Sequence, residues 1–204
     1  MANQLPVVRP LDAWLASRIV STIQDDHVRY EASQYGPLNG LLGHVFPLQR
    51  TFMVKPQPKL RPTTGPAPVN PPPGVRVSTD SMNNLVPSRT TAAGRAREAV
   101  FEPDFIIVKA GPNYGDDTAL AIVEVKNEED GVPLSVDVDQ ILKYMASIFS
   151  KAPANDLKGY LVVKGTTSVY GLPATANIPA QQLVVIDTAT QLKGNLKMLA
   201  HTHW

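Results

Sequence analysis

The chain has 204 residues, of which 43% are hydrophobic, and this suits one domain with a sizeable core. It has no cysteine, which excludes a disulfide scaffold, a thiolate zinc site and a cysteine nucleophile. Its net charge of +1 supplies no strong field that would draw the whole chain to nucleic acid. No run of about 18 apolar residues occurs, and MANQLPVVRPLDAW lacks the pattern of a secretory signal, so we expect an intracellular protein of the cytoplasm or nucleus, with no membrane span.

Residues 11 to about 31 carry the spacing of an amphipathic helix. Its apolar residues recur every three or four positions, at Leu11, Trp14, Leu15, Ile19, Ile23 and Val28. We expect Trp14 to lie in the core, and Tyr35-Gly36-Pro37 to end the helix. The segment Leu38–Phe46 is either a short second helix or an irregular apolar stretch.

Proline is concentrated in one part of the chain. Eight of the 19 prolines lie within residues 56–73, where fixed φ angles and missing N–H groups exclude a helix or a central strand. A strand at Phe52–Val54 is expected to enter this tract, and a short strand is expected at Val75–Val77. We interpret residues 56–95 as an extended, Pro-rich and polar insertion within a single domain that spans residues 1–204.

The second half of the chain alternates between strand and helix patterns. Strands are predicted at Asp104–Lys109, Ala119–Lys126, Gly159–Lys164 and Leu183–Ile186, and a helix over Val138–Phe149. The turn Gly111–Asp117 joins the first two strands as an antiparallel hairpin. This order of elements predicts an α/β domain with a mixed central sheet. His201 and His203, in the C-terminal HTHW, are expected in a frayed tail.

Charged side chains mark the ends of the two hairpin strands. Asp104 opens the first strand, and Glu124 and Lys126 close the second on one face, because side chains alternate along a strand. Antiparallel pairing brings Asp104 within reach of Glu124. Two adjacent carboxylates repel each other and need a shared proton or a cation. With the Val125 carbonyl as a third ligand they suit Mg²⁺ or Mn²⁺, and Lys126 would orient an attacking water or stabilise a pentavalent phosphorus.

These residues carry a resemblance to a known family. Pro103-Asp104, followed by Glu124-Val125-Lys126 at the end of an apolar strand, resembles the PD-(D/E)XK nuclease superfamily, which has the restriction-endonuclease-like fold. Gln140 and Tyr144 lie on one helix face and are similar to the Gln-x-x-x-Tyr element of its RecB-like branch. The resemblance covers residues 98–165 and, less directly, the N-terminal helix.

The resemblance implies an α/β/α core with a mixed central sheet. It also implies a metal-dependent nuclease that hydrolyses phosphodiester bonds in nucleic acid, with DNA expected and RNA left open, and a homodimer by analogy with many members. Asp104, Glu124 and Lys126 would be catalytic, while Gln140 and Tyr144 would brace the site or touch the substrate backbone. The 20-residue spacing from Asp104 to Glu124 is longer than usual in the family, and the long hairpin turn accounts for the difference.

Members of the family often add a metal ligand from the first helix. Glu31 is the first candidate here, ahead of Asp26 and His27, because it lies where the helix ends and the chain turns toward the sheet. A solvated charge at a helix end is the alternative interpretation of Glu31.

Basic residues are unevenly distributed along the chain. Residues 1–102 hold 11 Lys/Arg and 7 Asp/Glu, a net +4, while residues 103–204 hold 8 and 11, a net −3. The candidate phosphate contacts are Arg89, Arg95, Arg97 and Lys143. A solvated loop is the alternative for the three arginines. Two further hypotheses stay open beside the nuclease: a catalytically silent module of the same fold that binds nucleic acid or a protein, and an unrelated α/β domain.

Overall fold

The computed structural model of the chain describes residues 13–24, 32–58, 77–79, 85–87, 102–113, 115–126, 132–149, 153–172 and 180–204. Within them lie helices α1 (Ala13–Gln24), α2 (Ala32–Val45), α3 (Ser135–Phe149) and α4 (Leu192–Thr202). The strands are β1 (Phe52–Pro56), β2 (Val77–Thr79), β3 (Leu85–Pro87), β4 (Phe105–Lys109), β5 (Thr118–Lys126), β6 (Pro153–Val163), β7 (Thr166–Gly171) and β8 (Gln181–Asp187). None of these helices has the length and apolar character needed to cross a membrane.

The main sheet has six strands in the order β1-β4-β5-β6-β7-β8. The β5–β6 pair is parallel and the other four pairs are antiparallel, so the predicted α/β class with a mixed sheet is confirmed. Within the predicted insertion, β2 and β3 pair with each other, and β2 overlaps the predicted strand at Val77.

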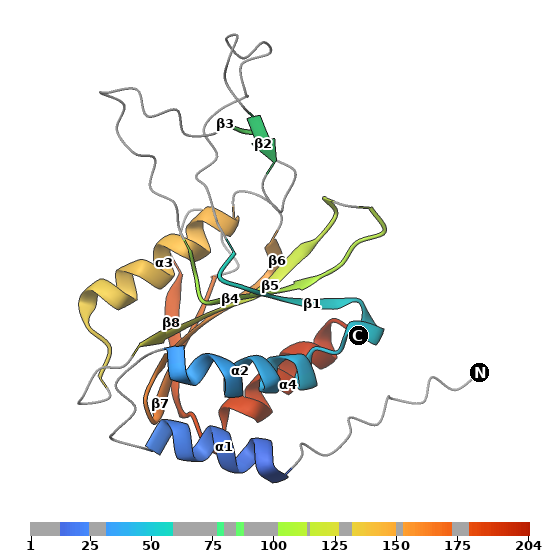
Figure 1. Cartoon of the computed structure of the whole chain (residues 1–204). Helices are drawn as coiled ribbons and strands as arrows, with labels where there is room; N and C mark the ends of the chain where they lie inside the picture. Colours follow the sequence, from blue (N-terminus) through green and yellow to red (C-terminus); the bar gives the residue numbers. More distant parts are fainter. Residues whose placement is uncertain are drawn as a thin grey trace.

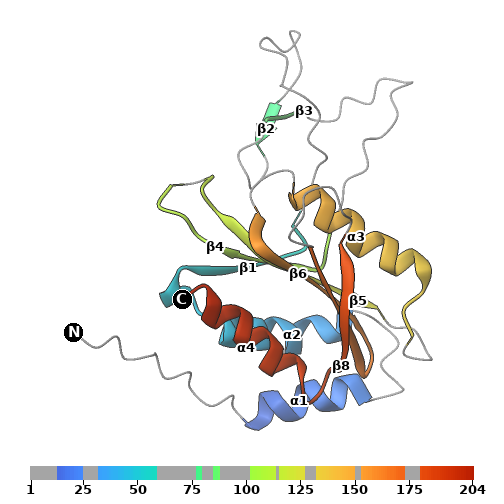
Figure 2. The same cartoon turned by 180° about the vertical axis from the view of Figure 1, so that it is seen from behind.

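Two layers of helices enclose the sheet. Helices α1, α2 and α4 lie on one face and α3 lies on the other (Figures 1 and 2). Side chains of β4 alternate between the two cores: Phe105 and Ile107 pack toward α2 and α4, and Ile106 packs toward α3. On β5, Ile122 faces α3, so the strand period of two directs Glu124 and Lys126 to that same face.

The N-terminal helices differ from the sequence prediction. Tyr35-Gly36-Pro37 does not end a helix but lies inside α2, in which Pro37 removes one backbone donor. The helix forms nevertheless because its continuation buries Leu38, Leu42 and Val45, and tertiary packing outweighs local propensity.

Trp14, which the sequence pattern places in the core, is 68% exposed. It lies on the solvent face of α1 with Arg18 and Ser21, which follow at helical spacing and are exposed as well. The buried face of α1 is instead built around Ile19 and Thr22.

Two elements of the C-terminal part are absent from the sequence prediction, β7 and α4. The sequence of β7 lacks the apolar alternation typical of a strand because the strand buries polar residues. Among them is Thr167, whose hydroxyl is 2.9 Å from that of Thr188. The expected frayed tail is also wrong, because α4 continues to Thr202 and His203 Nε2 lies 2.9 Å from Asp156 Oδ1.

Glycine at position 159 sets how closely α3 approaches β6. A Cβ at Gly159 would stand 2.6 Å from Met145 Sδ and 3.2 Å from Ile141 Cδ1, so we expect Gly159→Ala to cost about 1–3 kcal/mol. A Cβ at Gly43, an exposed position of α2, would meet nothing within 4 Å, and Gly43→Ala should gain roughly 0.5–1 kcal/mol. Urea unfolding of both variants measures whether their changes in the free energy of unfolding have opposite signs. Equal changes would contradict the close packing of α3 on β6.

Candidate functional site

The β4–β5 hairpin brings Asp104 and Glu124 together at one end of the sheet. Phe105 pairs with Val123, so Asp104 stands opposite Glu124, and opposite residues of an antiparallel pair point to the same face. The Asp104 N–H donates to Glu124 Oε2 at 3.3 Å, and the Val125 N–H donates to Asp104 Oδ2 at 2.7 Å. The two carboxylates are therefore neighbours, as the sequence predicts.

Both carboxylates are removed from water. Asp104 is 7% exposed and Glu124 is 2% exposed. Burial, and secondly the charge of Asp104, raise the pKa of Glu124 from 4.5 to about 7. Burial also raises the pKa of Asp104, against the opposing effects of Tyr35, the Val125 N–H and Lys126. Near neutral pH the pair is thus poised to hold a proton that a cation would displace.

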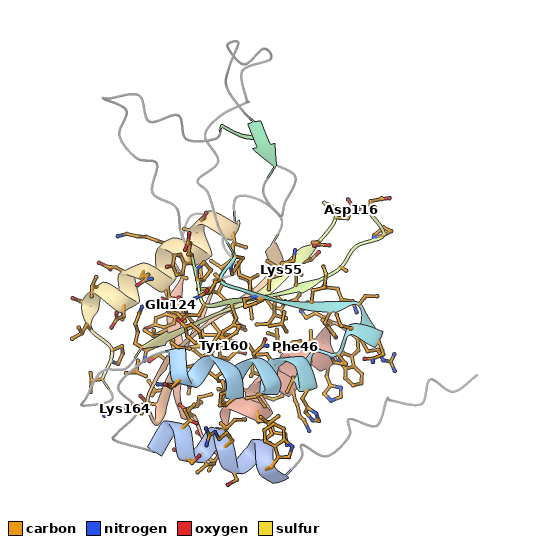
Figure 3. All side chains as sticks on the ribbon, viewed as in Figure 1. Phe46, Lys55, Asp116, Glu124, Tyr160 and Lys164 are labelled. Carbon is orange, nitrogen blue, oxygen red and sulfur yellow. The ribbon has the colours of Figure 1, made fainter. Side chains whose placement is uncertain are left out.

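Lys126 lies against this pair from the same strand. Its Nζ is 2.9 Å from Glu124 Oε1, and its side chain is 15% exposed, so it has access to solvent where the carboxylates have little. The ammonium lowers the pKa of Glu124 without outweighing burial and the charge of Asp104. Figure 3 shows Glu124 at this end of the sheet, beneath α3.

Helix α3 contacts Glu124 through a hydrogen bond. Gln140 Nε2 donates to Glu124 Oε1 at 2.8 Å and to Tyr144 Oη at 2.5 Å, so the predicted helix face of Gln140 and Tyr144 is confirmed as a contact. The Tyr144 hydroxyl donates in turn to the Glu102 carbonyl at 3.4 Å. Burial raises the pKa of Tyr144, which keeps the hydroxyl neutral and able to donate.

Tyr35 belongs to the site, although the sequence pattern assigns it to a turn. From α2 it donates to Asp104 Oδ1 at 2.5 Å, and its ring packs edge-on against Phe105 with centroids 5.7 Å apart. The apolar spacing through Leu38 and Leu42 is the signal that could have placed Tyr35 on the inner face of a helix, since it continues across Pro37.

We expect Tyr35→Phe to destabilise the protein at pH 7 by about 1.5–3 kcal/mol, the usual contribution of a hydrogen bond to a charged group. The substitution keeps the ring against Phe105 but leaves Asp104 Oδ1 without this donor. Tyr160→Phe is the matched control, because the Tyr160 hydroxyl donates to Asn195 Oδ1 at 3.0 Å away from the carboxylates. Urea unfolding with and without Mg²⁺ should show a weakened metal response in Tyr35→Phe alone; the same response in both variants would contradict the assignment.

The remaining sequence candidates either lie outside the described residues or stand apart from this cluster. Glu31, with Asp26 and His27, and the three arginines Arg89, Arg95 and Arg97 lie outside the described residues. Lys143 is exposed on α3. Asp117 at the hairpin tip pairs with Lys55 at 3.0 Å, and Figure 3 shows neighbouring Asp116 far from Glu124.

The donor set fits a small hard cation. No cluster of three or more His, Asp or Glu side chains that could hold a metal occurs in the described part of the chain. Mg²⁺ in proteins is commonly held by one or two carboxylates, with waters completing its shell, so Asp104, Glu124 and the Val125 carbonyl suffice. The two buried carboxylates that lie side by side support the fit, because burial and, secondly, the charge of Asp104 raise the pKa of Glu124.

Comparisons with protein-family models, with curated proteins and with solved structures give no match to this chain.

Proposed function

We propose that this protein is a metal-dependent nuclease of the PD-(D/E)XK type, with a restriction-endonuclease-like core, that hydrolyses phosphodiester bonds in nucleic acid, with DNA as the expected substrate. The observation that carries the proposal is the buried Asp104–Glu124 pair with Lys126 beside it, at the adjoining ends of two strands. With β2 and β3 of the predicted insertion set aside, the chain order from α2 is β1, β4, β5, α3, β6. This order supports the proposal, since a helix, three strands, a helix and a strand make up the core that the resemblance implies.

The charge balance of the site favours a bound cation. When both carboxyl groups are ionised, Asp104 and Glu124 bring two negative charges and Lys126 brings one positive charge, while Tyr35, Gln140 and Tyr144 are neutral. A structural ion pair between Glu124 and Lys126 would need no second buried carboxylate. Asp104 supplies the excess negative charge, and burying it without compensation is costly.

Each residue of the site has a distinct role in the proposed hydrolysis. Asp104, Glu124 and the Val125 carbonyl would hold Mg²⁺ or Mn²⁺, which when bound polarises a phosphoryl oxygen and lowers the pKa of water. Lys126 orients the nucleophilic water and stabilises the negative charge on the oxygens of the pentavalent phosphorus. Gln140 fixes the rotamer of Glu124, and Tyr144 fixes Gln140 in turn.

Cleavage assays with labelled single-stranded DNA, duplex DNA and RNA test the proposal, in Mg²⁺, in Mn²⁺ and in EDTA. Metal-dependent cleavage by the wild type that is lost in both Asp104→Ala and Lys126→Ala is the expected result. Substrate binding without cleavage in any metal would favour the catalytically silent module. Cleavage that persists in both variants would overturn the assignment of the site.

A further inference from the structure

Three exposed aliphatic side chains follow one another closely where the chain enters α3. Val132 is 58% exposed, Leu134 is 50% exposed and Val136 is 62% exposed, and no charged residue lies between Val132 and Val136. We call these three residues the apolar lip. Exposed aliphatic residues that are scattered singly need no explanation, but a group of them beside a buried polar site is typical of a surface that contacts a ligand.

The topology of the sheet places the apolar lip beside the Asp104–Glu124 site. Helix α3 connects β5 to β6, which are parallel neighbours, so the helix returns along the sheet against the direction of β5. From Glu124 to Lys126 the strand advances about 6.6 Å. From Gln140, which contacts Glu124, back to Val136 on the same helix face, the helix covers about 6 Å in that same direction. Val136 therefore lies at the level of Lys126, where the site meets solvent.

Hydrogen bonds at the start of α3 fix the apolar lip in place. The Leu134 N–H donates to Asp137 Oδ2 at 3.0 Å, and the Asp137 N–H donates to the Leu134 carbonyl at 3.0 Å. Asp137 is 5% exposed, so its carboxylate is buried in this cap rather than exposed beside the lip. A fixed apolar surface binds a ligand at a lower cost in conformational entropy than a mobile one.

We propose that the apolar lip contacts the face of an unpaired base next to the phosphate that is cleaved, so that the substrate is a single strand rather than a duplex. The inference rests on the proposed nuclease function, in which the cation and Lys126 take the phosphate. Aliphatic side chains gain nothing from the charged phosphates on either side of it, and the flat face of a base is the apolar part of a nucleotide. Neighbouring bases cover that face in a duplex, whereas a single strand leaves it available.

The charges around the lip also favour a single strand. Binding of a duplex relies on several Lys or Arg contacts to its phosphates. Within α3, Asp137 and Asp139 are acidic and Lys143 is the single basic residue. Lys55, which lies on the same face of the sheet, is paired with Asp117 at 3.0 Å. In these described elements the surface thus offers few phosphate contacts and one apolar contact, which suits a strand whose base supplies part of the binding.

Cleavage of a labelled single strand and of its duplex, in Mg²⁺ and in Mn²⁺, tests the inference. We expect the wild type to cleave the single strand with a kcat/KM about tenfold higher than that for the duplex. The double variant Leu134→Ser with Val136→Ser should lower kcat/KM for the single strand about fivefold to tenfold, the lower part of what base stacking contributes. Met198→Ser is the matched control, because Met198 is 64% exposed on α4, on the other face of the sheet, and it should behave as the wild type. Circular dichroism verifies that each variant is folded.

A strand without bases tests the contact itself. An oligomer of tetrahydrofuran residues keeps the phosphates of oligo-dT and removes every base. The wild type should cleave oligo-dT about fivefold to tenfold faster than this strand. The double variant should cleave the two at similar rates, because the substitutions and the missing bases remove the same interaction.

The outcomes separate the inference from the nuclease function on which it rests. Equal cleavage of single strand and duplex by the wild type would overturn the inference and leave the nuclease function standing. A double variant that keeps the full preference for oligo-dT would do the same, in favour of a protein partner at the lip. No cleavage of any substrate in either metal would instead refute the nuclease function, and the inference with it.

Discussion

Replacing Asp104 by asparagine should abolish metal-dependent cleavage and, at the same time, make the metal-free protein more stable at pH 8. Asparagine preserves the shape of the side chain: its carbonyl accepts from the Val125 N–H, and its amide donates to the Tyr35 hydroxyl. What disappears is one of two buried negative charges. Residues that serve function at a cost in stability behave in this way.

The stability gain has a defined dependence on pH. Because the folded state raises the pKa of Glu124 from 4.5 to about 7, the wild type loses stability as pH rises through this window. Asp104 is the second cause of that shift after burial, so Asp104→Asn lowers the pKa of Glu124 and recovers part of the loss. The full shift is worth roughly 3 kcal/mol, and we expect the variant to gain about 1–2 kcal/mol above pH 7 and little below pH 4.5.

Thermal unfolding at pH 4.5 and pH 8, in EDTA and in Mg²⁺, measures this effect. Mg²⁺ should raise the melting temperature of the wild type and leave that of Asp104→Asn unchanged. Asp116→Asn, on the exposed hairpin tip, removes a carboxylate remote from Glu124 and should behave as the wild type. A lower melting temperature for metal-free Asp104→Asn at pH 8 would show that the carboxylate pair is not under electrostatic strain.

Lys126→Met should also slow cleavage strongly, but its effect on stability has the opposite sign. The lysine lowers the pKa of Glu124, so its removal raises that pKa above about 7 and leaves the carboxylate buried without its cation. Breaking a buried pair by removing one partner costs about 3–5 kcal/mol, and the partial exposure of Lys126 places our expectation near 2–3 kcal/mol at pH 8. At pH 5 Glu124 is largely protonated in both proteins, and the difference should nearly vanish.

Urea unfolding of Lys126→Met at pH 5 and pH 8, together with cleavage rates, checks this expectation. We expect the rate to fall by roughly two to three orders of magnitude, as it does when one group that stabilises transition-state charge is removed. Lys197→Met, on α4, makes the same change of charge away from the carboxylates and should show no such dependence on pH. A Lys126→Met penalty that is equal at both pH values would mean that the lysine does not compensate Glu124.

The part of the site that follows from local sequence could be predicted. Asp104 and Glu124 lie in one hairpin, so strand alternation and antiparallel pairing were sufficient to bring them together. Gln140 and Tyr144 are four residues apart in one helix, which fixes their common face. Their contact with Glu124 depends on how α3 packs on the sheet, and only the resemblance indicated it.

The features that depend on long-range packing could not be predicted from the sequence. Tyr35 reaches Asp104 across 69 residues, and its segment contains Gly36 and Pro37, which locally favour a turn. Strand β7 buries Thr167 and Ser168 and so lacks the apolar alternation of a strand. Trp14 is exposed because the orientation of α1 is set by Ile19 and its neighbours, which no local pattern specifies.

Binding of Mn²⁺ followed by electron paramagnetic resonance tests most directly the claim that Asp104 and Glu124 form a metal site. The wild type is expected to bind one Mn²⁺ per chain, displaced by excess Mg²⁺, and Asp116→Asn is expected to bind it equally well. Asp104→Asn should leave the Mn²⁺ free in solution. Free Mn²⁺ in the presence of the wild type, or equal binding by Asp104→Asn, would contradict the account.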